Sequence, residues 1–300
     1  MSTHIIRARL RARSTLAAAA VAGTLGLVSA GAPPASAHDD GHGSHYLALG
    51  DSVSFGYITQ AGFEYGNPTN FIGFPEKVGA DRSLDVVNAS CAGQTSTSLI
   101  TGGQPDNGCI AYRSHFPLHV SYQGTQLAFA DQFLAAHRDT RLVTLLIGAN
   151  DAFVLQKQCA SAPDPTACFQ AGLPALTQTI GANLNTIFNS LRSTGYRGRI
   201  VALTYYSLDY SDAAGTGLTQ LLNSVITQSA AAHHVTVADA FATFKAATST
   251  QFAGGSSCKA GLLNASPQNQ FLCDVHPSQS GQQLLARTVE DAIAEAGGDD

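Results

Sequence analysis

Five short, mostly apolar segments of the chain have the character of buried β-strands. They are residues 46–49, 85–90, 142–147, 199–204 and 235–238. Between them lie stretches in which apolar residues recur every three or four positions, which is the spacing of an amphipathic helix. Strands that alternate with helices predict a parallel sheet with right-handed crossovers and helices on both faces. We therefore predict a three-layer α/β/α domain.

The most regular helical pattern lies between Pro174 and Gly195. Proline is favoured in the first turn of a helix and glycine just past its end, so these two residues are predicted to bound the helix. Ser280 and Gln283 fit a capping box, which predicts the start of the last helix. Residues 104–124 have no clear period and are predicted to form a loop.

The amino-terminal stretch has the pattern of an export signal. Four arginines precede an apolar stretch at residues 16–30, and Ala35-Ser36-Ala37 follows it. This is the arrangement of a secretory signal peptide that is cleaved after Ala37. The apolar stretch is shorter than the ~20 residues that span a bilayer, so no membrane span is expected. We predict a secreted, extracellular protein with a leader at 1–37, a flexible tail at 38–45 and one domain at 46–300.

Charge narrows the choice of partners. The whole chain has a formal net charge of −5, and the leader holds four arginines and no acidic residue, so the exported part carries −9. A surface of this sign disfavours phosphate backbones, which predicts that nucleic acid is not a partner. The sequence contains no P-loop, dinucleotide fingerprint or His-Glu-x-x-His motif. We therefore expect no cofactor and no metal. We also expect a monomeric protein.

All six cysteines lie in the exported part of the chain. An even number of cysteines in an exported protein favours disulfides over metal ligation, although six cysteines allow 15 connectivities. Each sequential pair brackets a loop-like stretch, so we predict the pairs Cys91–Cys109, Cys159–Cys168 and Cys258–Cys273.

Chemically useful residues follow the predicted strands. The first strand runs into Gly50-Asp51-Ser52, the second is followed by Gly93, and the third by Asn150; Asp274-Val275-His276-Pro277 lies near the carboxyl terminus. Ligands of open α/β sheets bind at the carboxyl ends of the strands. A serine hydroxyl becomes a good nucleophile when an imidazole takes its proton. These motifs therefore suggest nucleophilic catalysis by Ser52 with His276 as base.

In order and approximate spacing, these four motifs resemble those of the SGNH (GDSL) hydrolase family, and of its secreted actinobacterial esterases and lipases in particular. The resemblance extends from Tyr46 to about Ala296. It implies a five-stranded flavodoxin-like sheet and a catalytic pair of Ser52 and His276. It also implies an oxyanion hole formed by the backbone N–H groups of Ser52 and Gly93 and the side-chain amide of Asn150.

The chain departs from the family pattern beside the base. The family usually has Asp three residues before the catalytic His, where this chain has Cys273, and Asp274 is only two residues ahead. Side chains two apart on an extended segment point the same way. Either the Asp274 carboxylate or a backbone carbonyl orients His276, and we favour Asp274 because an ionised partner also stabilises the imidazolium.

The resemblance implies a serine hydrolase that cleaves carboxylic acyl esters of lipids or small molecules. A carbohydrate acetylesterase on the same fold and a non-catalytic secreted binding protein are the alternatives. Residues 57–74 are rich in glycine and contain Phe63, Tyr65, Phe71 and Phe74. These aromatic residues either form a wall for an apolar acyl group or only cover the core.

Overall fold

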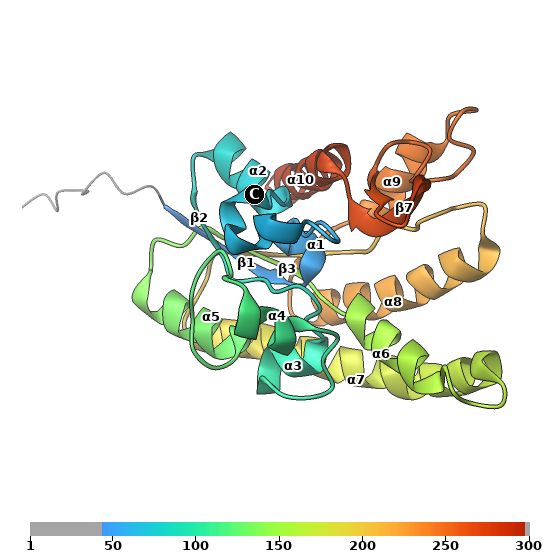
Figure 1. Ribbon diagram of the computed structural model, residues 1–300. Coiled ribbons are helices and arrows are strands. Elements are labelled where there is room, and N and C mark those ends of the chain that lie inside the picture. Colours follow the sequence, from blue (N-terminus) through green and yellow to red (C-terminus); the bar gives the residue numbers. More distant parts are fainter. Residues whose placement is uncertain (1–43, 298–300) are drawn as a thin grey trace, which may run out of the picture. The chain divides into compact units, whose positions relative to one another are not determined.

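The predicted central sheet is present in a computed structural model of the protein, which describes residues 44–297 except for the side chains of residues 270 and 271. Its five strands are all parallel and follow the order β2-β1-β3-β4-β5 (Figure 1). This is the flavodoxin-like order, so the predicted fold is confirmed. The strands are β1 (His45–Gly50), β2 (Asp85–Asn88), β3 (Leu142–Leu146), β4 (Arg199–Leu203) and β5 (Thr236–Ala238).

Helices cover both faces of the sheet and complete the three layers (Figure 1). One layer contains α2 (Phe74–Arg82), α9 (Ala240–Thr248) and α10 (Gln279–Glu295). The opposite layer contains α5 (Gln126–Ala136), α7 (Pro165–Ser193) and α8 (Ala213–Ala232). Within residues 44–297, no helix is long and apolar enough to cross a bilayer.

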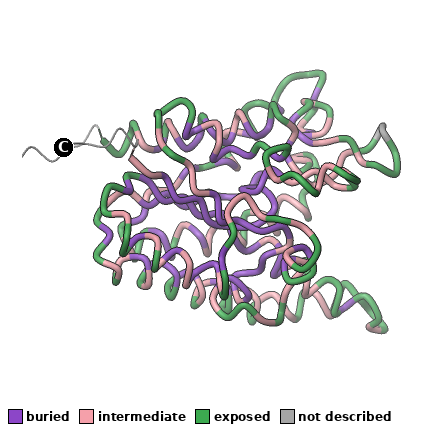
Figure 2. Tube along the Cα trace, turned by 60° about the vertical axis from the view of Figure 1, so that its left-hand side comes forward, coloured by how far each residue is buried: buried purple, intermediate pink, exposed green. Residues whose placement is uncertain are grey.

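The sheet lies in the most deeply buried part of the core (Figure 2). All five residues of β3 are buried, as are Leu47 and Leu49 of β1. Such nearly continuous apolar strands are typical of parallel sheets that are covered on both faces. The polar residues among them are paired, because the hydroxyls of Tyr46 and Thr144 lie 2.8 Å apart. The core therefore fixes the carboxyl ends of β1 and β3.

The predicted leader at residues 1–37 and residues 38–43 of the predicted tail lie outside the described residues. Strand β1 begins at His45, one residue before the predicted start of the domain.

The prediction that Pro174 begins a helix is wrong. Helix α7 begins nine residues earlier, at Pro165, and Pro174 lies inside it. Asp164 caps the first turn, since its side chain accepts a hydrogen bond from the Ala167 N–H at 2.9 Å. Proline at the first helical position and Asp as N-cap are both favoured, so Asp164-Pro165 was the stronger start signal. The disulfide from Cys168 also holds this first turn.

Two other local predictions are wrong. Helix α10 has Ser278, not Ser280, as its N-cap, because the chain leaves the preceding strand at Pro277 and the Ser278 hydroxyl then meets the Gly281 N–H at 3.2 Å. The segment predicted as a loop at 104–124 contains a short helix, α4 (Cys109–His115). A helix of this length is set by its surroundings rather than by an apolar period.

A small antiparallel hairpin, separate from the main sheet, carries the carboxyl-terminal motif. It consists of β6 (Leu263–Ser266) and β7 (Asn269–Pro277), and its register is irregular. The sequence predicted an extended segment around His276 but not its pairing with β6. His276 therefore lies near the end of a strand that the hairpin supports.

Candidate active site

Ser52 lies where β1 ends and the short helix α1 (Ser52–Phe55) begins. Gly50 permits this turn, because its φ is +139° and a Cβ there would lie 2.3 Å from the Leu146 carbonyl oxygen. The buried Gln126 side chain braces the turn by accepting from the Gly50 N–H at 2.6 Å and donating to its carbonyl at 3.1 Å. Strands β1 and β3 form the switch point of this sheet, where ligands bind in flavodoxin-like folds.

Asp51 orders the backbone around Ser52. Its Oδ1 atom accepts a hydrogen bond from the Val53 N–H at 2.9 Å and so caps α1, while its Oδ2 atom accepts one from the Tyr205 hydroxyl at 2.5 Å. Burial raises the pKa of Asp51 to about 6, although the Tyr205 hydrogen bond opposes the increase. The geometry makes Asp51 a support for the turn rather than a partner of Ser52.

His276 links Ser52 to Asp274. Its Nε2 atom lies 2.9 Å from the Ser52 hydroxyl, and its Nδ1 atom lies 2.8 Å from Asp274 Oδ2. Burial would raise the pKa of Asp274, but the hydrogen bond and charge of His276 outweigh it and hold this pKa below its usual value. An ionised carboxylate only accepts hydrogen bonds, so Nδ1 carries the proton and Nε2 is free to accept the Ser52 proton.

Thr59, which no sequence motif marks, completes this chain of contacts. Its hydroxyl donates to Asp274 Oδ2 and lies 3.4 Å from His276 Nδ1. The residue belongs to the loop after α1, and no motif marked it because its partner is more than 200 positions away.

Gly93 and Asn150 face the same pocket as Ser52 and His276. Asn150 is buried in the first turn of α6 (Ala149–Cys159), directly after β3, and its Nδ2 atom donates to the Gln94 carbonyl at 3.0 Å. Gly93 has a φ of +83°, and a Cβ there would lie 2.7 Å from the Asn107 carbonyl oxygen. The structure therefore brings together all four residues that the motifs suggested.

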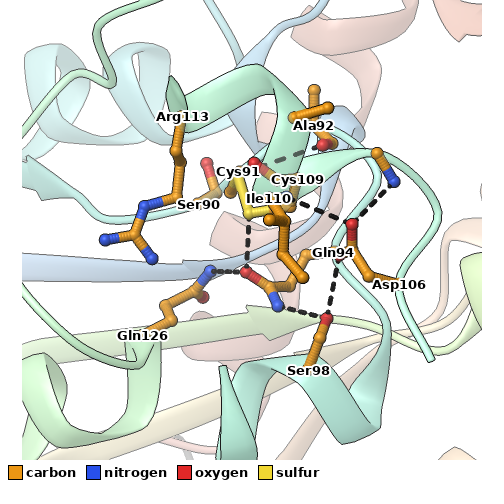
Figure 3. Close-up of a disulfide and its surroundings, with 12 residues drawn as sticks. Ser90, Cys91, Ala92, Gln94, Ser98, Asp106, Cys109, Ile110, Arg113 and Gln126 are labelled. Atoms are coloured by element: carbon orange, nitrogen blue, oxygen red, sulfur yellow. Dashed lines mark hydrogen bonds between the residues drawn. A yellow bond between two sulfur atoms is a disulfide. The ribbon is translucent and has the colours of Figure 1, made fainter. Parts of the chain in front are cut away.

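The predicted disulfide Cys91–Cys109 is formed beside Gly93 (Figure 3). Around it, the Gln94 side chain donates to the Ser98 hydroxyl at 2.5 Å, and that hydroxyl donates to Asp106 at 3.2 Å. These bonds and the disulfide close the segment that runs from the end of β2 to the start of α4.

The other cysteines are also joined in the sequential order that their spacing predicted. The pair Cys159–Cys168 connects the end of α6 to the first turn of α7. The pair Cys258–Cys273 ties β7 to the segment that precedes β6. The described cysteines include no free thiol.

A pocket of about 510 Å³ opens beside Ser52 and is lined mainly by apolar side chains. Many of these side chains come from α6, α7 and α8, and no sequence motif marked them as part of a site. An amphipathic stripe cannot by itself distinguish a side chain that packs from one that lines a cavity. The large apolar residues that these three helices contribute are Phe153, Leu173, Leu176, Ile180, Leu218, Leu221 and Leu222.

The possible aromatic wall at residues 63–74 is not part of this pocket. Phe71 and Phe74 are buried in the core, Phe63 is 90% exposed, and neither they nor Tyr65 line the pocket. Tyr57, which lies before this stretch at the start of the segment 57–74, does line the pocket, and its ring packs edge-on against the His276 imidazole with centroids 5.0 Å apart.

Comparisons with solved structures support the fold. An extracellular lipase from Streptomyces rimosus is 19% identical, with a TM-score of 0.54, over 83% of this chain and 99% of that one. Phospholipase A1 from Streptomyces albidoflavus NA297 is 21% identical, with the same TM-score of 0.54 and the same coverage of 83% and 99%. An acetylxylan esterase from Geobacillus stearothermophilus is 18% identical, with a TM-score of 0.51, over 84% of this chain and 95% of that one.

A search of curated protein sequences finds no match. A model of the GDSL-like lipase/acylhydrolase family, in contrast, matches residues 48–284. This range is well over half of the chain, and it includes Ser52, Gly93, Asn150, Asp274 and His276. The chain therefore belongs to the GDSL-like lipase/acylhydrolase family.

Proposed function

We propose that this protein is a secreted serine hydrolase that cleaves carboxylic acyl esters through an acyl-enzyme at Ser52. The observation that carries the proposal is the chain of contacts from Ser52 through His276 to Asp274, with distances of 2.9 and 2.8 Å. His276 Nε2 takes the hydroxyl proton as Ser52 Oγ attacks the ester carbonyl. Asp274 holds Nδ1–H and stabilises the imidazolium that forms.

The attack places negative charge on the former carbonyl oxygen. The backbone N–H groups of Ser52 and Gly93 and the Asn150 amide are the proposed donors to this oxyanion. His276 then gives its proton to the departing alcohol as the acyl–oxygen bond breaks. His276 next takes a proton from a water molecule as the water attacks the acyl-enzyme. It then returns the proton to Ser52 Oγ as the bond between Oγ and the acyl group breaks, which releases the carboxylic acid and restores the Ser52 hydroxyl.

The apolar lining of the pocket favours an acyl chain of several carbons over acetyl. The structural neighbours include a lipase and a phospholipase A1, and also an acetylxylan esterase, which represents the alternative of a carbohydrate acetylesterase. A sugar ring would need polar partners, and the side chains from α7 and α8 that face the pocket are mostly leucine and isoleucine. Export fits the disulfides, which persist in oxidising compartments.

A series of p-nitrophenyl esters from acetate to dodecanoate tests this proposal, together with a phospholipid and acetylated xylan. Burying each methylene contributes up to about 0.8 kcal/mol, so kcat/KM is expected to rise with chain length until the pocket is full. Ser52→Ala is the control and is expected to abolish hydrolysis. A preference for acetate and acetylated xylan would support the acetylesterase instead, and hydrolysis that survives in Ser52→Ala would contradict the proposal.

A further inference from the structure

The orientation of the Asn150 amide decides whether it is able to stabilise an oxyanion. An amide side chain presents an NH₂ donor on one side and a carbonyl acceptor on the other, and only the donor helps a developing negative charge. Asn107 Nδ2 donates to Asn150 Oδ1 at 2.6 Å. This bond occupies the acceptor and leaves Nδ2, which reaches the Gln94 carbonyl at 3.0 Å, as the group of Asn150 that is available to the pocket.

The side-chain amide of Asn107 also has two possible orientations, and Lys157 selects one of them. The Lys157 ammonium donates to Asn107 Oδ1 at 2.5 Å. An ammonium has three donors and no acceptor, so only the carbonyl side of Asn107 is able to face it. The NH₂ side of Asn107 must then face Asn150. Lys157 follows Asn150 by seven positions on α6, which is close to two helical turns, so both side chains leave the helix on the same side.

The backbone of Asn107 is also held at this place. Its N–H donates to the Gly93 carbonyl at 3.0 Å, and the segment between these two residues is closed by the disulfide Cys91–Cys109. The same short segment therefore contributes Gly93 to the pocket and positions the partner of Asn150. Figure 3 shows the disulfide with Gln94, Ser98 and Asp106 gathered around it.

We propose that Lys157 and Asn107 are positioning residues, which fix the Asn150 amide with its NH₂ group toward the oxyanion. This inference rests on the proposed function. Lys157 is exposed to solvent, so its role is to set the direction of the hydrogen bonds rather than to supply a strong field at the reacting atoms. We call the hydrogen bonds from Lys157 through Asn107 to Asn150 the relay. The relay requires the side chain at position 107 to accept a hydrogen bond from Lys157 and to donate one to Asn150.

Asn107→Asp tests this requirement with almost no change in the shape of the side chain. The carboxylate still accepts from Lys157, but it has no hydrogen to donate, so Asn150 is expected to turn its NH₂ group toward residue 107 and its carbonyl toward the oxyanion. We expect kcat to fall by about a hundredfold or more, as when an oxyanion donor is lost, with KM changed only a few-fold. Gln156→Glu adds the same charge beside Lys157 without entering the relay, and we expect it to remain near wild type.

A double-mutant cycle with neutral substitutions separates positioning from a direct role. Asn107→Ala alone is expected to lower kcat by about tenfold, and it is expected to cost nothing further in an Asn150→Ala background. The same loss in both backgrounds would overturn the proposal. If both Asn107 variants fail to fold, Lys157→Met at the surface still provides a test, with a few-fold loss of kcat that Lys157→Arg restores; wild-type turnover in Lys157→Met would overturn the relay.

These outcomes are distinguishable from failure of the proposed function. If hydrolysis survives in Ser52→Ala, the catalytic assignment is wrong and the relay has no oxyanion to serve. If Ser52→Ala is inactive and the Asn107 cycle is additive, the catalytic assignment holds and only the relay is wrong.

Discussion

The two residues that meet at 2.9 Å in the proposed active site are held by different kinds of structure. Ser52 follows β1, a buried interior strand of the main sheet, and its turn is braced by Gln126 and Asp51. His276 lies near the end of β7 in a two-stranded hairpin outside that sheet, and a disulfide at Cys273 ties this strand to the preceding segment.

This difference separates global stability from local stability. The position of Ser52 depends on packing that involves most of the core, so it is lost only when the domain unfolds. A two-stranded hairpin is marginally stable by itself, so the position of His276 depends on the disulfide Cys258–Cys273 and on the contact of Thr59 with Asp274. We therefore expect the hairpin that carries His276 to unfold locally before the main sheet does when denaturant is added.

The largest expected effect among the following variants concerns Asp274. Asp274→Asn removes the ionised partner of His276 and permits the wrong tautomer of the ring. In a serine protease triad this change costs about ten-thousandfold, and we expect a loss of at least about a hundredfold in kcat here. A folded variant within a few-fold of wild type would show that the site works as a pair of Ser52 and His276, oriented by the backbone.

The disulfide Cys258–Cys273 tests whether the hairpin is the weaker part. Replacing both cysteines with serine is expected to cost about 3 kcal/mol, the chain-entropy value for a 15-residue separation. In this variant we expect activity to be lost at a lower urea concentration than the urea concentration at which the circular dichroism signal of the folded domain is lost. Removing Cys159–Cys168 is the matched control, for which activity and circular dichroism should be lost together. If the two transitions coincide for both variants, the comparison is wrong.

Beside the nucleophile, the buried carboxyl of Asp51 is expected to make the stability of the fold depend on pH. Its folded pKa, raised to about 6 from 3.8, means that its contribution to stability is greatest below pH 4 and is lost as the pH rises through 6. Two pKa units correspond to about 3 kcal/mol, which is an upper limit. Asp51→Asn keeps a good N-cap, so the variant is expected to gain stability over wild type between pH 4 and 7.

Chemical denaturation of wild type and Asp51→Asn at several pH values provides this measurement. A constant difference between the two proteins from pH 4 to pH 7 would show that Asp51 is not protonated in the folded state.

The smallest expected effect concerns Thr59. Thr59→Val keeps the shape of the side chain but removes the hydroxyl that donates to Asp274. We expect a loss of less than about tenfold in kcat, because His276 and a backbone N–H still hold the carboxylate, and we expect Thr59→Ser to restore turnover. Steady-state kinetics of the three proteins decide this point, and equal losses in the valine and serine variants would show that packing is responsible.

The main sheet and the hairpin also differ in how far the sequence predicted them. Ser52, Gly93 and Asn150 follow apolar strands of a parallel sheet, and the ends of such strands are visible as local patterns that converge at one edge. The irregular pairing of β6 with β7, the contact of Thr59 with Asp274 and the apolar lining from α7 and α8 were not visible. Each of these depends on which segments meet in space, and no periodicity or motif in a single sequence encodes that choice.

Covalent labelling with a fluorophosphonate, followed by peptide mass spectrometry, tests the central assignment most directly. We predict that wild-type protein is modified at Ser52 with loss of hydrolysis, and that His276→Ala is modified at the same residue but much more slowly. Modification of a different serine that abolishes hydrolysis while Ser52 remains intact would contradict the account.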